Sequence, residues 1–411
     1  MNFSPPTEKR ERVLSGMRPT GKLHLGNYHG ALRNWVELQD RFEGYFFVAD
    51  WHALTTDYEN PGLLQQRVHE MVVDWLAAGL DPERVAIFVQ SEVPAHAELH
   101  LLLSMITPLS WLERVPTYKD QQAQLKEKDL ATYGFLGYPL LQSADILIYR
   151  PAWVPVGEDQ VAHVEITREV ARRFNHIYGR DEAFGKKLKA ALGRLPPPER
   201  ERYGELRRRF QEGGDAAALA EARTLAATAG SPAPEQRELL LAALEGEHHR
   251  LLPAPEVLLT PSPKVTGLDG RKMSKSYGNT IGLTEDPASI EKKMKAMTTD
   301  PARVRRTDPG NPERCPVWDL HKIYSSDETR AWVWEGCTTA GIGCLECKKP
   351  LIERVCADAT AMRERAAPYQ DNPGRVREIL EAGAKRANAT AGETMQVVRK
   401  AMNLLPPGAG S

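Results

Sequence analysis

The chain has 411 residues, and its 54 lysines and arginines nearly balance its 55 aspartates and glutamates, giving a formal net charge of -1. With 41% hydrophobic and 27% charged residues, the composition is typical of a soluble globular protein and not of a disordered or membrane protein. Any binding of nucleic acid must therefore come from local basic patches. The polar start, MNFSPPTEKRER, lacks the apolar core of a signal peptide, and no apolar run is long enough for a membrane span. We expect a cytoplasmic protein of roughly two or three domains without membrane contact.

The first informative stretch, Ser15 to Gly30, reads SGMRPTGKLHLGNYHG and lies between a short apolar run and a segment with helical periodicity. A strand, a glycine-bearing turn and a helix N-terminus present backbone N–H groups and a positive dipole end to an anion. His24 and Asn27 could reach phosphate oxygens there, and Gly26 would leave room for a flat base. The alternative is an ordinary turn with a surface histidine, because short motifs often occur by chance.

The next elements predict an α/β domain with a doubly wound parallel sheet. Residues 45–50 (YFFVAD) and 85–91 (VAIFVQS) are apolar runs without alternation, as in strands that are buried on both faces. Between them lies an amphipathic helix that should end at Gly79. Ligands of such sheets bind at the carboxyl ends of the strands, where the 15–27 stretch, residues 50–52 and residues 90–91 should meet.

Two polar features follow. Asp145 interrupts the apolar run LLQSADILIY, and a buried carboxylate there needs a hydrogen-bond donor. A helix cap or an ion pair would explain it equally well. The turn Gly157-Glu158-Asp159-Gln160 precedes a helix that should begin near Val161, and it offers groups suited to ribose hydroxyls or an ammonium group.

Residues 180–252 are rich in alanine, glutamate, arginine and proline, and they predict two to four amphipathic helices inserted into the α/β domain. Asp215 should cap one of them, and Gly230 should follow its end. Their charged faces are expected to be solvated, with an RNA-facing role as the less favoured alternative.

A strand and a glycine-bearing loop follow the insertion. Within the loop, Lys272-Met273-Ser274-Lys275-Ser276 places two lysines three residues apart, where they could neutralise a triphosphate as it reacts. A solvated basic loop is the alternative. From Ile290 onward the pattern is helical and predicts a separate domain, in which Arg303, Arg305 and Arg306 could follow phosphates.

All five cysteines lie in the last quarter of the chain, and four of them are Cys315, Cys337, Cys344 and Cys347. In a reducing compartment such a cluster indicates a metal centre more than disulfides. Cys356 lies beyond the set and should be a buried helix residue.

Together, HLGN and KMSKS resemble the two signatures of the class I aminoacyl-tRNA synthetases. The ordered motifs SGMRPTGKLHLGN, ADWHALT, SADILIYRPAWVPVGEDQ and GRKMSKS are similar to those of the bacterial tryptophanyl branch, over nearly the whole chain. Only residues 180–252 have no counterpart in this resemblance. It implies a Rossmann-like catalytic domain in two parts, residues 1–179 and 253–289 with the KMSKS loop, around the helical insertion 180–252. Residues 290–411 would form an α-helical, anticodon-binding domain.

The resemblance implies a two-step reaction. ATP and L-tryptophan would give tryptophanyl-adenylate and pyrophosphate with the help of Mg²⁺, and the aminoacyl group would then pass to the terminal ribose of tRNA-Trp. The resemblance also implies a homodimer. The rival interpretations are a tyrosyl-tRNA synthetase-like enzyme, a small-molecule adenylyltransferase and an RNA-binding paralogue without catalysis.

The resemblance also assigns residues. It implies catalytic roles for His24, Asn27, Lys272 and Lys275. The implied ATP site comprises Arg18, Pro19, Thr20, Gly26, Asn27, Gly157, Glu158, Asp159, Val265, Lys272, Met273, Ser274, Lys275 and Ser276, with Lys119 as a weaker candidate. Asp145 would accept the indole N–H, and the other implied tryptophan-binding residues are Tyr138, Gln142, Gln160 and His52. The chain departs from the common pattern at Asn27 in place of histidine, at Arg18 in place of glutamine and at Gln142 in place of methionine.

The spacing C-x21-C-x6-C-x2-C resembles the [4Fe–4S] motif of a subset of these synthetases. Cys₄ spacing cannot by itself separate a cluster from structural zinc, which remains the chemical alternative. Four unliganded thiols are the least favoured interpretation.

Overall fold

The computed structural model describes residues 10–115, 132–157, 160–179, 183–213, 215–228, 232–245, 249–260 and 263–405. Within these ranges, no helix combines the length and the apolar character that crossing a membrane requires.

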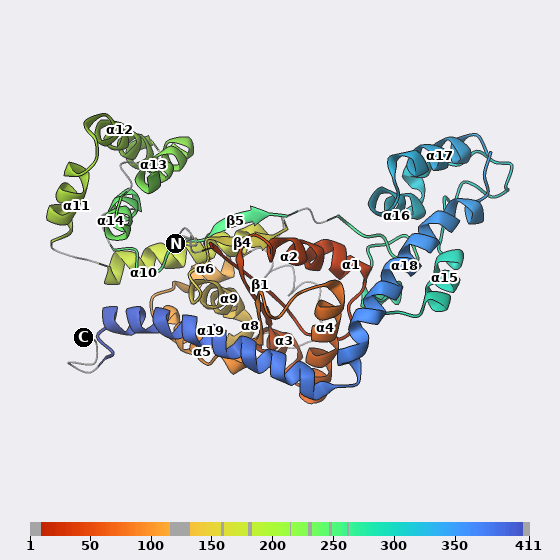
Figure 1. Ribbon diagram of the computed structural model, residues 1–411, viewed down its shortest axis with the longest axis horizontal. Helices are drawn as coiled ribbons and strands as arrows, with labels where there is room; N and C mark the ends of the chain where they lie inside the picture. The colour runs from red at the N-terminus through yellow and green to blue at the C-terminus, as the bar shows by residue number, and fades with distance from the viewer. Residues whose placement is uncertain are drawn as a thin grey trace, which may run out of the picture. The chain divides into compact units, whose positions relative to one another are not determined.

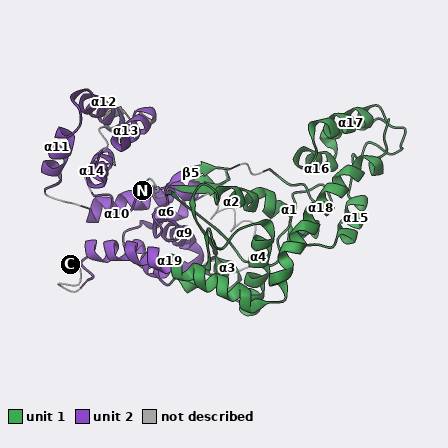
Figure 2. Cartoon of the chain, in the orientation of Figure 1, with its two compact units in different colours: residues 1–93, 153–161, 257–387 green, residues 94–152, 162–256, 388–411 purple. Residues whose placement is uncertain are grey.

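The chain forms two compact units, shown in green and purple in Figure 2. Unit 1 comprises Met1–Val93, Trp153–Val161 and Val257–Ala387, and unit 2 comprises Pro94–Ala152, Ala162–Glu256 and Asn388–Ser411. These units follow compactness, whereas the domains expected from the sequence follow function. The functional boundaries therefore stay predictions.

A five-stranded sheet forms the centre of unit 1 (Figure 1). Its strands are β1 (Arg12–Met17), β2 (Glu43–Val48), β3 (Ala86–Val89), β4 (Trp153–Val156) and β5 (Glu256–Leu259), in the order β3-β2-β1-β4-β5. β1 pairs in parallel with both β2 and β4, and β2 pairs in parallel with β3. This order confirms the expected Rossmann-like sheet and places a topological switch point between β1 and β4, where such sheets bind their ligands.

Aromatic packing joins the sheet to the helices beside it. Trp35 of α2 (Arg33–Leu38) stacks on Phe46 of β2 with ring centroids 4.9 Å apart. Trp75 of α4 (Leu64–Ala78) meets Trp35 edge-on at 5.2 Å. As predicted, α4 ends at Gly79, whose φ of 112° is left-handed and therefore favours glycine.

The other helices of unit 1 are α1 (Leu25–Asn27), the π-helical turn η1 (Tyr28–Leu32), α3 (Asp50–Asp57), η2 (Pro61–Leu63), η3 (Gln90–Glu92), η5 (Lys275–Tyr277), α15 (Pro287–Ala296), η6 (Pro312–Arg314), α16 (Pro316–Tyr324), α17 (Asp327–Thr338) and α18 (Cys344–Gln370). The long helix α19 (Pro373–Ala401) gives its first part to unit 1 and its last part to unit 2. α18 packs against α4 and α15 through a shared apolar core. The helical pattern expected after Ile290 is confirmed.

Unit 2 is helical. Its elements are α5 (Ala95–Ser104), α6 (Leu109–Glu113), α8 (Tyr133–Leu136), α9 (Tyr138–Leu147), α10 (Val161–Tyr178, of which Val161 lies in unit 1), α11 (Phe184–Gly193), α12 (Pro197–Gly213), α13 (Ala216–Thr228) and α14 (Pro234–Glu245). Helix α10 begins where the sequence predicted.

Helices α11 to α14 share a hydrophobic core of their own, in which Tyr203, Leu206 and Leu240 are buried. Four helices in the described part of this segment agree with the expected two to four. The predicted cap is also present, because Asp215 Oδ1 accepts a hydrogen bond of 3.0 Å from the backbone N–H of Ala218. Gly230 lies outside the described residues.

Candidate functional site

The turn after β1 holds His24 in a defined orientation. His24 is the N-cap of α1, and its Nδ1 accepts the backbone N–H of Gly26 at 3.1 Å. Asn27 Oδ1 accepts the backbone N–H of His24 at 3.1 Å, which completes a reciprocal capping box. A Cβ on Gly26 would lie 2.9 Å from His24 Nδ1, so the close approach requires glycine. Asn27 therefore holds His24 in place.

The same geometry fixes the protonation of His24. Burial, and secondly the charge of Lys275, lowers the pKa of His24 to about 4, so the ring is neutral at physiological pH. Because Nδ1 accepts a hydrogen bond, the single proton lies on Nε2. His24 thus offers one N–H donor.

Backbone hydrogen bonds bring the two signatures together. Leu25 N–H donates to Ile281 O at 3.0 Å, and Leu283 N–H donates to Leu23 O at 3.1 Å. Between these bonds, His24 and Gly282 form an antiparallel bridge. The segment after KMSKS is therefore paired, through backbone hydrogen bonds, with the segment that carries His24.

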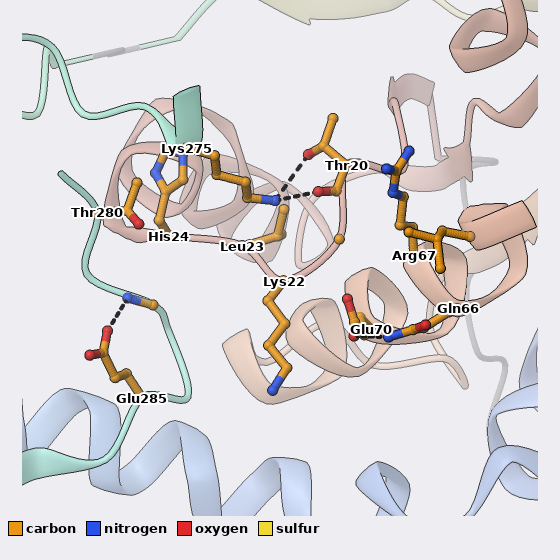
Figure 3. A pocket seen from close by; sticks show the side chains of 13 residues that line it. Thr20, Lys22, Leu23, His24, Gln66, Arg67, Glu70, Lys275, Thr280 and Glu285 are labelled. Atoms are coloured by element: carbon orange, nitrogen blue, oxygen red, sulfur yellow. Dashed lines mark hydrogen bonds between the residues drawn. The ribbon is translucent and has the colours of Figure 1, made fainter. Parts of the chain in front are cut away.

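A cavity of about 370 Å³ lies at this junction and is lined by both signatures (Figure 3). The Lys275 ammonium group donates to Thr20 O at 2.6 Å and to Thr20 Oγ1 at 3.2 Å. Several charged side chains line the cavity. The charged side chains besides Lys275 are Lys22, Arg67, Glu70 and Glu285. His24 and Lys275, predicted separately, thus line one polar cavity.

Acidic groups balance this positive charge. Burial lowers the pKa of Lys275, and the charges of Asp74 and Glu70 oppose that shift. Asp74 is itself only 2% exposed, and it accepts hydrogen bonds from Leu23 N–H and from the Thr284 hydroxyl. Burial raises its pKa to about 6, against these hydrogen bonds. Sequence reasoning missed Asp74, because an acidic residue on an amphipathic helix gives no sign of its partners.

Apart from Thr20 and Lys275, the described residues of the expected ATP site do not line this cavity. Lys272 is exposed, and its backbone pairs with Thr266 instead of lining the cavity. Ser276 is exposed in η5, while Ser274 N–H donates to Asn279 Oδ1 at 2.8 Å. Among the remaining residues, Val265, Met273 and Pro19 are buried, Arg18 is half-buried, and Gln160 N–H donates to Gly157 O at 3.0 Å. Glu158, Asp159 and Lys119 lie outside the described residues.

The expected tryptophan-binding residues occur in both units. His52 is buried on α3 of unit 1. Tyr138, Gln142 and Asp145 all lie on α9 of unit 2. Tyr138 Oη is 3.3 Å from His163 Nε2.

Asp145 has the donor that its burial requires. Its side chain is 1% exposed, and its Oδ1 lies 2.6 Å from Nδ1 of His96. Sequence reasoning expected a donor but did not identify His96, which stands in the apolar stretch VPAHAELHLLL on α5. One indication of this donor was present in the sequence, namely a histidine among apolar residues.

The four clustered cysteines lie close enough to affect one another. Burial, and then the other three thiols, raises the pKa of Cys347 to about 12. Yet in the described part of the chain no three His, Cys, Asp or Glu side chains are placed to hold a metal ion. A tetrahedral zinc site needs sulfurs roughly 3.8 Å apart, given Zn–S bonds of about 2.3 Å. The thiols are thus gathered but do not form a ready-made zinc site.

Two further expectations for this region can be compared with the structure. Cys356 lies in helix α18 as expected, but it is half-buried instead of fully buried. Arg303 donates to the carbonyls of Arg306 and Ile342, and Arg306 pairs with Glu346. These arginines thus have partners within the protein.

Comparison with known proteins agrees with this geometry. The family model described as tRNA synthetases class I (W and Y) matches residues 7–192 and 236–357. The tryptophan–tRNA ligase of Ralstonia nicotianae is 59% identical over 394 residues, which cover 96% of this chain and 98% of that protein. The corresponding ligase of Thermotoga maritima is 45% identical over 396 residues, covering 96% and 99%.

A solved structure points the same way. Tryptophanyl-tRNA synthetase from Campylobacter jejuni, in complex with ADP and tryptophan, superimposes with a TM-score of 0.71 at 28% identity and covers 95% of this chain and 99% of that one. With His24 and Lys275 in one cavity and a family match over most of its length, the chain belongs to the tryptophan–tRNA ligases of the class I tRNA synthetase family.

Proposed function

We propose that this protein activates L-tryptophan with ATP and then transfers it to tRNA-Trp. The observation that carries this proposal is the shared cavity of His24 and Lys275, whose signatures lie far apart in the sequence. The tryptophan–tRNA ligases similar to this chain along almost their whole length support the choice of amino acid.

In the first step, a carboxylate oxygen of tryptophan attacks the α-phosphorus of ATP. A new P–O bond forms, the bond to the β-phosphate breaks, and pyrophosphate leaves with the electron pair. Such a reaction depends on positioning and charge stabilisation more than on a strong base. The terminal ribose hydroxyl of tRNA-Trp then attacks the carbonyl carbon of the adenylate, and AMP leaves.

Two side chains of the cavity suit this chemistry. We assign the Nε2–H of His24 to a phosphate oxygen, since the ring is neutral and Asn27 holds it in place. We assign the Lys275 ammonium group to the leaving pyrophosphate, whose negative charge it would stabilise. Lys272, exposed on the same loop, has the same proposed role without a place in the described cavity.

Mg²⁺ would share the charge of the leaving group. It usually binds through substrate phosphates with few protein ligands.

For the amino acid, we propose that Asp145 accepts the indole N–H, since indole can only donate. Tyr138, Gln142, Gln160 and His52 keep their predicted roles in tryptophan binding. The other residues expected to bind ATP likewise stay predictions. They are Arg18 through Thr20, Gly157 through Asp159, Val265, Met273, Ser274 and Ser276.

We further propose a metal centre at Cys315, Cys337, Cys344 and Cys347. Four thiols fit the ligand demand of a [4Fe–4S] cluster, which distributes its ligands over four irons and is larger than one ion. Zinc remains the alternative. Iron and sulfide analysis of anaerobically purified protein, with visible absorbance, tests the proposal. Colourless protein that contains zinc and no iron would exclude the cluster.

A homodimer in the cytoplasm completes the proposal, on the resemblance alone. Sedimentation velocity at micromolar concentration tests the dimer, and a purely monomeric boundary would contradict it.

ATP–pyrophosphate exchange, measured with each of the twenty amino acids, tests the central proposal. We expect exchange with tryptophan and charging of tRNA-Trp. Exchange with tyrosine would favour the tyrosyl enzyme, exchange without tRNA charging would favour a small-molecule adenylyltransferase, and no exchange would favour an RNA-binding paralogue. Lys275→Met, which should exchange much more slowly, provides the control.

A further inference from the structure

Three buried side chains form a line of hydrogen bonds in unit 2. His96 is 0% exposed on α5, and its Nδ1 lies 2.6 Å from Asp145 Oδ1. Its Nε2 lies 2.6 Å from the hydroxyl of Tyr149, which follows the end of α9 and is also fully buried. Helices α5 and α9 pack against each other, so the line joins the two helices.

The chemistry of the three groups assigns the proton nearest the carboxylate. An ionised carboxylate only accepts hydrogen bonds, so with Asp145 ionised the shared hydrogen lies on His96 Nδ1. In the neutral ring, Nε2 then accepts from the Tyr149 hydroxyl; in the charged ring it donates to it. In both cases His96 donates to Asp145.

We propose that His96 is a positioning residue that sets the selectivity for tryptophan by orienting Asp145. This inference rests on the proposed function, in which Asp145 accepts the indole N–H. A hydrogen bond donated to the charged form of an acid favours that form, so the contact with His96 favours the ionised, acceptor-only form of Asp145. A carboxylate has about four lone-pair sites, so its bond to His96 leaves acceptor capacity for the substrate.

Selectivity for tryptophan follows from the orientation of the Asp145 carboxylate, which accepts the hydrogen bond. A site built to accept a substrate N–H discriminates strongly against analogues without one, because its buried polar group then loses a partner. Without His96, the carboxyl group could rotate or take up a proton, and a protonated carboxyl would present a donor to a donor-only indole. Discrimination would fall while ATP binding would not change.

Two amide variants separate the two ring nitrogens. His96→Asn places an amide N–H near the position of Nδ1 and keeps the donor to Asp145. His96→Gln places its amide near the position of Nε2, and so keeps the contact with Tyr149 but loses the donor to Asp145. We expect His96→Gln to raise the tryptophan KM about 10- to 100-fold, as for a lost hydrogen bond to a charged group. The KM for ATP should stay within about twofold, and His96→Asn should remain near the wild type.

The decisive measurement compares tryptophan with β-(3-benzothienyl)alanine, in which sulfur replaces the indole N–H. The ratio of kcat/KM for the two amino acids in ATP–pyrophosphate exchange reports recognition of the N–H. We expect this ratio to fall about tenfold or more in His96→Gln and to be preserved in His96→Asn. A merely structural role would lower kcat/KM for both amino acids equally.

Asn175 provides a matched control in the same unit. It is buried, and its side chain makes two hydrogen bonds to the backbone of Leu252, at 2.8 and 2.9 Å. Asn175→Ala therefore removes buried hydrogen bonds without touching Asp145, and the ratio should not change. If His96→Gln does not fold, Tyr149→Phe supplies the test, because loss of the Tyr149 hydroxyl leaves His96 less constrained and should lower the ratio in the same direction.

An unchanged ratio in the folded variants, or equal changes in the KM for ATP and for tryptophan, would overturn the role of His96. The proposed function would survive that result, because the wild-type protein would still exchange with tryptophan. Absence of tryptophan-dependent exchange in the wild-type protein would instead overturn the proposed function and this inference together.

Discussion

His24 works as a neutral hydrogen-bond donor. Its pKa of about 4, lowered by burial and then by Lys275, lies well below the ordinary value of 6.5. Its Nε2–H therefore persists through the whole physiological range, and the ring needs no change of charge to contact a phosphate.

A pH profile tests this state of His24. We expect kcat/KM for ATP in the exchange reaction to show no acidic limb near pH 6.5 that depends on His24, because His24 gains its second proton only near pH 4. His24→Asn should lower the rate about 10- to 100-fold at every pH, as for a lost hydrogen bond to a charged group, and leave the shape of the profile unchanged. A limb at 6.5 that disappears in His24→Asn would contradict the neutral donor.

Lys275 and Lys272 form a matched pair on one loop. Both side chains are exposed, but Lys275 lines the cavity and Lys272 does not. We expect Lys275→Met to lower kcat for exchange about 10²- to 10³-fold, as for the loss of a group that stabilises a transition-state charge. Lys272→Met should have the smaller effect. Equal losses would show that both lysines reach the phosphates during the reaction.

At this scale, the residues that could be predicted are those within short motifs. His24 and Lys275 were found because their neighbours in sequence carry the signal. Asp74 and His96 were missed, because each contacts a partner about fifty residues away and belongs to no motif. A buried polar residue on a helix shows that a partner exists, but only the tertiary structure shows which one.

At the scale of elements, α4 joins the two halves of the cavity. Asp74 accepts hydrogen bonds from Leu23, next to His24, and from Thr284, on the segment after KMSKS. One side chain of a core helix thus supports both signatures.

Asp74 also makes stability depend on pH. Its folded pKa of about 6 exceeds the ordinary 3.8, so its contribution is fully present below about pH 4 and is lost as pH rises through 6. The shift corresponds to roughly 3 kcal/mol. We expect the unfolding free energy of the wild type, minus that of Asp74→Asn, to fall by up to that amount between pH 4 and pH 8. Chemical denaturation at each pH measures it, and a constant difference would show that Asp74 does not titrate in this range.

The elements themselves were largely predictable. Buried strands read as apolar runs, and Gly79 marked the end of α4 through its left-handed backbone. The π-helical turn η1 was not predictable, because it arises within a segment of ordinary helical periodicity. Within this turn, His29 Nε2 lies 2.8 Å from the Tyr324 hydroxyl, a contact between residues far apart in the sequence.

At the scale of the whole molecule, helices α11 to α14 have a core separate from the core around the sheet. The family model leaves residues 193–235 unmatched, and these fall within this group of helices. The group therefore has the means to fold around its own apolar residues.

Leu206, which is fully buried in that core, provides the test. We expect Leu206→Ala to destabilise the helices by about 2–4 kcal/mol, through lost burial and the resulting cavity. Hydrogen exchange should show the loss in α11 to α14, while the KM values for ATP and tryptophan stay unchanged. Leu101→Ala, at a position 56% exposed, is the control and should change stability by less than about 0.5 kcal/mol. Altered KM values in Leu206→Ala would link these helices to catalysis.

The lowered pKa of Lys275 has a consequence for chemical labelling. A lowered pKa favours the uncharged, nucleophilic form of an amine, and so favours its reaction with acylating or aldehyde reagents. An ATP analogue that carries such a reactive group on its phosphate end would be delivered to Lys275, while the exposed Lys272 serves as the internal reference for unselective modification. The lysine proposed to stabilise the leaving group is thereby also a site for modification by a covalent inhibitor.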